Sequence, residues 1–122
     1  MVLTYKKQFN KKFKQPLDKS NSKYKISKLT GIKGTIINKI FDRGVGAHKT
    51  NPKSVRIKGT FKKDTDLKKF PIKSRLTPEQ WGYARIYSAV MNYYHWKKTG
   101  KEKGAFKSDR DLFKKYQPSL LN

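Results

Sequence analysis

A chain of 122 residues with 34% hydrophobic side chains is long enough for one domain with one modest core, so a second domain is not expected. Its 31 Lys and Arg residues against eight Asp and Glu give a formal charge of +23, which opposes compaction unless an anionic partner neutralises it. No apolar run approaches the length of a membrane span, and the absence of cysteine excludes disulfides and thiolate metal sites.

The first 27 residues are predicted to form a basic extended arm. Asp18 is the lone acid among many lysines, and four aromatic residues are spaced between them: Tyr5, Phe9, Phe13 and Tyr24. A segment of this kind holds little apolar surface and is expected to become ordered only on a partner, with its aromatic residues as anchors. We therefore divide the chain into an arm, 1–27, and a small α-dominated domain, 28–122.

The next segment carries a helical stripe of apolar side chains, made of Ile32, Ile36, Ile37, Ile40 and Phe41. This spacing predicts a first helix over about 30–43, with Gly44 as its C-cap. Residues 44–76 contain many glycines and prolines and are predicted to be mostly structured loop. The alternation in SVRIKGTFKK, 54–63, favours a short strand or hairpin arm within that loop.

Thr77, Pro78 and Gln80 have the pattern of an N-cap, first helical position and capping box, and Gly100 is the expected stop. The apolar and aromatic side chains between them cover more than one helical face, which predicts a helix central to the fold or shared with a neighbour. A last helix, DLFKKYQ, is predicted with caps at Ser108 and Asp111 and an end at Pro118, its inward residues being Leu112, Phe113 and Tyr116. The predicted fold is therefore mainly α, with about three helices.

The stretch RGVGAHKTNPKSVR, residues 43–56, combines glycines, Lys-Thr and an Asn-Pro turn, and has two interpretations. It lacks the G-x-x-x-x-G-K-[ST] pattern of a phosphate-binding P-loop, because His48 stands where the last glycine is needed. One interpretation is a turn built by a set of small and polar residues, namely Gly44, Gly46, Asn51, Pro52 and Ser54. The other is a nest of backbone amides that holds a phosphate or carboxylate.

Arginine accounts for only five of the 31 basic residues. Its planar fork binds phosphate or carboxylate with two parallel hydrogen bonds, which lysine cannot imitate, so each arginine is a candidate for a specific contact. The residues predicted to face an anion are Arg43, Lys49, Arg56, Arg75 and Arg85.

Catalytic patterns are weak in this chain. His48 and His95 are far apart and have no cysteine or acidic cluster near them, and Asp64 and Asp66 lie among lysines as a solvated patch. No nucleophile stands beside a base. The chain is therefore predicted not to be an enzyme, and to need no metal, cofactor or small-molecule substrate.

Three motifs resemble a small domain of unknown function found in large DNA viruses and tailed phages: RGVGAHKTNPKSVR, SRLTPEQWGYARIYSAV and SDRDLF. The similarity covers about residues 40–113, with a longer charged insertion, RIKGTFKKDTDLKKFPIKS, between the first two motifs. The resemblance implies a viral protein, often encoded among structural genes, and supplies no catalytic residues.

Charge and resemblance together predict a non-enzymatic structural protein of a virus particle, a minor capsid or cement-like component. It is expected to tie shell proteins to each other or, through phosphates, to the packaged nucleic acid. Its expected location is the virion, and the host cytoplasm or nucleus before assembly. A ribosomal-type RNA-binding protein and a viral DNA-condensing protein remain alternatives, since both fit the lysine excess.

Overall fold

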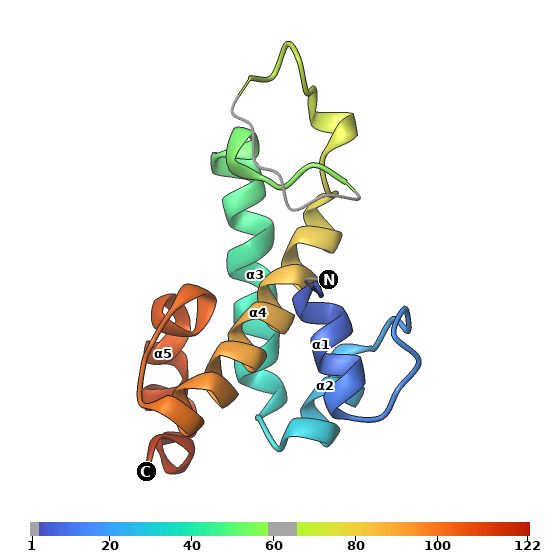
Figure 1. Cartoon of the computed structure of the whole chain (residues 1–122). Helices are drawn as coiled ribbons and strands as arrows, with labels where there is room; N and C mark the ends of the chain where they lie inside the picture. The colour runs from blue at the N-terminus through green and yellow to red at the C-terminus, as the bar shows by residue number, and fades with distance from the viewer. Residues whose placement is uncertain (1–2, 59–65) are drawn as a thin grey trace.

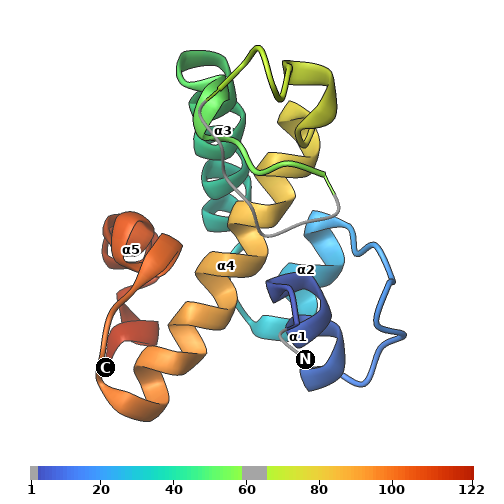
Figure 2. The same cartoon turned by 45° about the horizontal axis from the view of Figure 1, so that its top comes forward.

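The computed structural model describes residues 3–58 and 66–122, and this part of the chain is mainly helical, as predicted. It contains five α-helices: α1 (Tyr5–Lys12), α2 (Lys23–Thr30), α3 (Gly34–Thr50), α4 (Pro78–Thr99) and α5 (Gly104–Tyr116). Short 3-10 turns occur at Pro52–Ser54, Ile72–Ser74 and Pro118–Leu121. Helix α4 lies at the centre, with α1 and α5 on opposite sides of it (Figures 1 and 2). None of the helices in the described part is long and apolar enough to cross a membrane.

Helix α4 begins and ends where its capping residues predict. The Thr77 side chain accepts from the backbone N–H of Gln80 at 3.1 Å, and the Gln80 side chain accepts from the backbone N–H of Thr77 at 2.9 Å. Gly100 ends the helix with a positive φ of 77°. The buried residues of α4 lie on several of its faces: Gly82, Ile86, Tyr87, Ala89, Val90, Asn92 and Tyr93. The prediction of a helix central to the fold is confirmed.

The prediction of an extended N-terminal arm is wrong, because α1 and the first part of α2 lie within residues 1–27. Tyr5, Phe9 and Phe13 are four residues apart, so a helix places them along one side. Phe9 is completely buried, and its ring packs edge-on against Tyr87 at 5.3 Å between centroids. Burying one phenylalanine contributes about 1.5–3 kcal/mol, which offsets part of the entropy lost in ordering the segment.

Two buried asparagines hold the turn between α1 and α2 against α4. Asn21 Nδ2 donates to Asn10 Oδ1 at 2.7 Å, and Asn10 Nδ2 donates to the carbonyl oxygens of Leu17 and Lys19 at 2.8 and 3.0 Å. The Tyr87 hydroxyl accepts from the Asn21 backbone N–H at 3.3 Å. These bonds satisfy polar groups that would otherwise be buried without partners, so the turn belongs to the folded domain.

Helix α3 starts four residues later than predicted and continues to Thr50. Gly44 and Gly46 are therefore inside the helix, and the prediction that they form a turn is wrong. The turn lies further along the chain, where Pro52 opens a 3-10 turn and the Ser54 backbone N–H donates to the Asn51 carbonyl at 3.1 Å. The turn roles of Asn51, Pro52 and Ser54 are confirmed.

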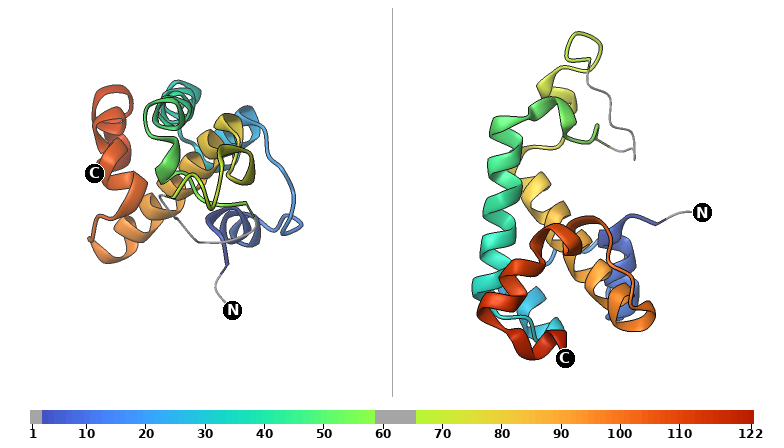
Figure 3. Two further views of the ribbon diagram at one scale, coloured as in Figure 1. Left: turned by 90° about the horizontal axis from the view of Figure 1, so that it is seen from above. Right: turned by 90° about the vertical axis from the view of Figure 1, so that its left-hand side faces the viewer.

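The connection from α3 to α4 lies at one end of the molecule (Figure 3). Of the predicted strand or hairpin, the described residues form one antiparallel bridge between Ile57 and Arg75. Backbone bonds join Lys58 N–H to Ser74 O and Leu76 N–H to Arg56 O, both at 3.0 Å. The second half of the predicted strand, from residue 59 on, lies outside the described residues, as does Asp64.

Helix α5 begins at Gly104, so Ser108 and Asp111 lie within the helix and are not its caps. Leu112 and Phe113 are buried, as predicted, and the helix ends before Pro118. The Phe113 ring stacks on Tyr93 of α4 with centroids 5.5 Å apart and planes 9° apart. Aromatic residues of α4 thus enter the core, which is the role their helical spacing favours.

Candidate nucleic-acid interface

Two predicted anion-facing arginines bind an aspartate of the chain itself. Arg85 on α4 donates to both oxygens of Asp109 on α5, from Nε at 3.0 Å and from Nη2 at 2.9 Å. Arg43 on α3 donates from Nη1 to Oδ1 of the same carboxylate at 2.9 Å. The Asp109 side chain is fully buried, so these bonds replace the contacts with water that its carboxylate has lost. We call this meeting of three helices the arginine junction.

Arg43 also binds Asp111, which lies two residues after Asp109 on α5. Its Nη1 and Nη2 donate to the two carboxylate oxygens at 2.9 and 2.6 Å. The hydrogen bonds to Asp111 raise the pKa of Arg43, and the same contact lowers the pKa of Asp111 below its ordinary value. With two carboxylates already in its fork, Arg43 has little capacity left for an external anion.

Two glycines let α3 and α4 approach closely enough to form the arginine junction. A Cβ atom added to Gly44 would stand 2.7 Å from the Cα of Gly82, and one added to Gly82 would stand 2.6 Å from the Phe41 ring. Both contacts are far inside van der Waals distance, so only glycine fits either position. Gly44 of RGVGA and Gly82 of WGYAR therefore serve helix packing, a role that the turn interpretation missed.

Arg75 is also used inside the molecule. It is 1% exposed, and its guanidinium donates to three backbone carbonyls: Phe70 at 3.0 Å, Lys53 at 2.9 Å and Val55 at 2.9 Å. These bonds hold the two sides of the connection between α3 and α4 together. An arginine buried among carbonyls in this way is a structural tie, and its geometry does not favour binding an external anion.

Arg56 differs from these three arginines. It is half-buried, and its Nε is buried without a hydrogen-bond partner in the described part of the chain. Burial lowers its pKa, because desolvation penalises the charged form. Lys49 is exposed at the end of α3 and does not join Arg56 at a common site. The structure therefore does not bring the five predicted residues together.

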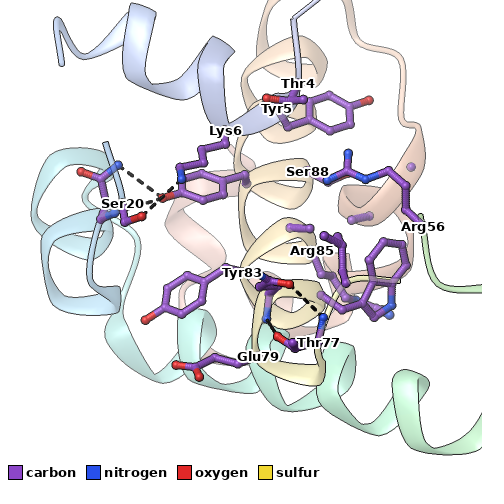
Figure 4. A pocket seen from close by; sticks show the side chains of 18 of the residues that line it. Thr4, Tyr5, Lys6, Ser20, Arg56, Thr77, Glu79, Tyr83, Arg85 and Ser88 are labelled. Atoms are coloured by element: carbon purple, nitrogen blue, oxygen red, sulfur yellow. Dashed lines mark hydrogen bonds between the residues drawn. The ribbon is translucent and has the colours of Figure 1, made fainter. Parts of the chain in front are cut away.

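Arg56 lines a groove of about 1130 Å³ that runs along the first half of α4 (Figure 4). The start of α1, the residues before α2 and the start of α5 complete its walls. Among the described residues, three cationic side chains line it, those of Lys6, Arg56 and Arg85, and one acidic side chain, that of Glu79. No local pattern in the sequence indicated this groove, since its walls come from five segments that only the fold brings together.

The lysines form the outer surface. Every lysine that the structure describes is exposed or half-buried. Of the five ion pairs between described residues, four are made by arginine, and the fifth joins Lys7 to Asp18. Three of the described carboxylates, those of Glu102, Asp109 and Asp111, are thus paired with arginines, while the lysines have no carboxylate partner at most described positions.

His48 has a structural contact in the fold. His48 is buried and its Nε2 lies 3.0 Å from the Leu76 carbonyl, which ties α3 to the start of α4. Among the described residues, no group of three or more His, Asp or Glu side chains is placed to hold a metal ion.

Fold and surface together define a small, mainly helical protein whose arginines are largely internal ties and whose lysines face outward. Comparison of the chain with known protein families, curated proteins and solved structures finds no match. The resemblance to the viral domain therefore rests only on the three motifs quoted in the sequence analysis.

Proposed function

We propose that the chain is a non-enzymatic basic structural protein of a virus particle that ties the shell to the packaged nucleic acid through its lysine surface. The observation that carries this proposal is the distribution of charge. Arginines neutralise most of the paired carboxylates, and the described lysines all reach the surface. At the described positions the excess positive charge therefore faces outward, where a polyanion of high charge density is the matching partner.

The three resembling motifs add support from a second direction. Arg43 and Gly44 of the first motif meet Gly82 and Arg85 of the second and Asp109 of the third. A motif set whose members contact each other is what a shared fold requires. We infer that the motif residues hold the helices of the domain together, and that the lysines outside the motifs contact the binding partner.

Salt dependence of nucleic-acid binding tests the proposal. Six to ten phosphate contacts would weaken binding by about 10³- to 10⁵-fold between roughly 50 and 200 mM salt. Replacing Lys98, Lys101 and Lys103, all exposed, by glutamine should make the slope of log affinity against log salt shallower by about 0.9 per lost contact. The same three positions changed to arginine are the matched control, since they keep the charge. An affinity that hardly changes with salt would contradict the proposal.

Mass spectrometry of purified particles, before and after removal of the genome, tests the location. We expect the chain in both samples, because it binds shell proteins as well as nucleic acid. Loss together with the genome would favour a DNA-condensing protein, and association with ribosomes in place of particles would favour a ribosomal-type protein.

A further inference from the structure

The groove beside α4 has features that a general lysine surface does not need. We propose that it binds a single-stranded segment of nucleic acid, with Arg56 holding a phosphate and Tyr5 offering an aromatic face to the bases. This inference rests on the proposed function and deepens it, since it names the form of nucleic acid and the place where it binds.

Electrostatics favour an anion in the groove. Lys6, Arg56 and Arg85 line it against the single carboxylate of Glu79. Arg85 uses Nε and Nη2 to bind Asp109. It therefore adds positive electrostatic potential to the groove but does not offer a guanidinium fork for a bidentate contact. Lys6 donates to the Ser20 hydroxyl at 3.3 Å, a long bond that a phosphate oxygen would readily replace.

Arg56 is the residue that most needs a ligand. Figure 4 shows its side chain reaching into the groove toward Ser88. Its buried Nε has lost water without gaining a partner in the described part of the chain. A phosphate oxygen there would restore the missing hydrogen bond and the missing counter-charge together, which is why a guanidinium fork suits this position better than an ammonium group.

The aromatic side chains separate single strands from duplexes. Tyr5 is 37% exposed, and Tyr83 is partly exposed along the same groove. Tyr87, by contrast, is buried and bonded to Asn21. Bases in a duplex are already stacked on each other, whereas unpaired bases can stack on exposed aromatic rings. The groove also exceeds the range of about 300–1,000 Å³ usual for small-molecule pockets, which suits a strand that runs along it.

The first test compares Arg56→Gln with Lys49→Gln, two variants that each remove one positive charge. Lys49 is exposed and lies outside the groove. The probes are a fluorescent 12-residue oligothymidylate and a 12-base-pair duplex, titrated by anisotropy at fixed salt. We expect Arg56→Gln to weaken oligothymidylate binding about tenfold and Lys49→Gln about twofold, with similar small losses on the duplex for both. Arg56→Lys, which keeps the charge without the fork, should weaken the single strand more than Lys49→Gln does.

The second test compares Tyr5→Ala with Tyr24→Ala. Tyr24 is 71% exposed on α2 and is not part of the groove, so it controls for the loss of a surface ring. Stacking on one base changes affinity by about fivefold or more, so Tyr5→Ala should weaken the single strand to that extent and Tyr24→Ala should not.

The outcomes distinguish the groove from the proposed function. Equal losses for Arg56→Gln and Lys49→Gln, with salt-dependent binding retained, would overturn the groove and leave the function standing. No binding of either probe by the unchanged protein would overturn the function itself. Arg56-dependent binding of polyglutamate that is tighter than that of oligothymidylate would overturn the groove proposal in favour of an acidic protein segment.

Discussion

The arginine junction and the groove contain the same kind of side chain in opposite circumstances. At the junction, Arg43 and Arg85 meet a fully buried carboxylate, Asp109, and satisfy it with three hydrogen bonds of 2.9 to 3.0 Å. In the groove, Arg56 gives up water at its Nε and meets no acid among the described residues. The arginines of the junction stabilise the fold, whereas the Nε of Arg56 keeps a hydrogen-bond donor without a partner among the described residues.

The difference lies in what each burial costs. A desolvated charge is expensive alone, and pairing with good geometry offsets the penalty. The junction offsets it inside the molecule, so its arginines stabilise α3, α4 and α5 relative to each other. At Arg56 the described residues supply no such partner, and in our proposal a ligand supplies it. The same residue type therefore marks structure in one place and a candidate binding site in the other.

The same substitution, arginine to methionine, tests the difference between the arginine junction and the groove. Arg85→Met should lower the free energy of unfolding by on the order of 3 kcal/mol, because Asp109 would stay buried with one partner fewer. Arg56→Met should leave it within about 1 kcal/mol or raise it, since an unsatisfied cation is replaced by an apolar chain of similar length. Urea unfolding without nucleic acid measures both. A large loss in Arg56→Met would show that Arg56 is a structural tie as well.

Two glycines of α3 sharpen the account of the junction. Gly44→Ala should destabilise the protein by about 1–3 kcal/mol, because the new methyl would press on the Gly82 backbone at 2.7 Å. Gly46→Ala should stabilise it by about 0.5–1 kcal/mol, because Gly46 is helical and a Cβ there meets nothing within 4 Å. Thermal melting compares the pair. Similar losses at both positions would mean that α3 and α4 do not cross at Gly44.

The smallest expected effect is the pH dependence of the Arg43 contact. Since Arg43 lowers the pKa of Asp111 in the folded state, the stabilisation is present above the ordinary carboxyl pKa and is lost as the pH falls through the lowered one. The Asp111 side chain is 61% exposed, so the contribution is at most about 1 kcal/mol. The stability difference between the unchanged protein and Asp111→Asn should therefore shrink on acidification below about pH 4 and in high salt. A difference that does not shrink between pH 4 and pH 2 would contradict this.

Local sequence patterns predicted the helix whose ends are marked by capping residues. Thr77, Pro78, Gln80 and Gly100 define α4 because capping depends on neighbours within a few residues. The isoleucine stripe located α3 for the same reason. The end of α3 was missed because Gly44 resembles a cap, and nothing within the helix indicates that another glycine packs against it.

The N-terminal segment shows the opposite failure. Its lysines suggested an arm, although Tyr5, Phe9 and Phe13 already had helical spacing. Whether such a stripe folds depends on an apolar surface to receive it, and that surface is Tyr87 and its neighbours on α4, far along the chain. The groove was missed for the same reason, since Arg56 and Tyr5 become neighbours of one cavity only when α1 docks.

The sequence by itself determined the helical class, the central helix and the outward excess of positive charge, because composition, spacing and caps act over a few residues. Only the tertiary structure decided which arginines pair with carboxylates inside the protein. Coulombic pairing and desolvation act through space, so the partners of Arg43, Arg85 and Arg56 depend on whether α5 brings a carboxylate within about 3 Å. Arg43 and Arg85 both pair with Asp109 and are part of the fold, whereas Arg56 meets no carboxylate among the described residues, which is why we propose it as a binding residue.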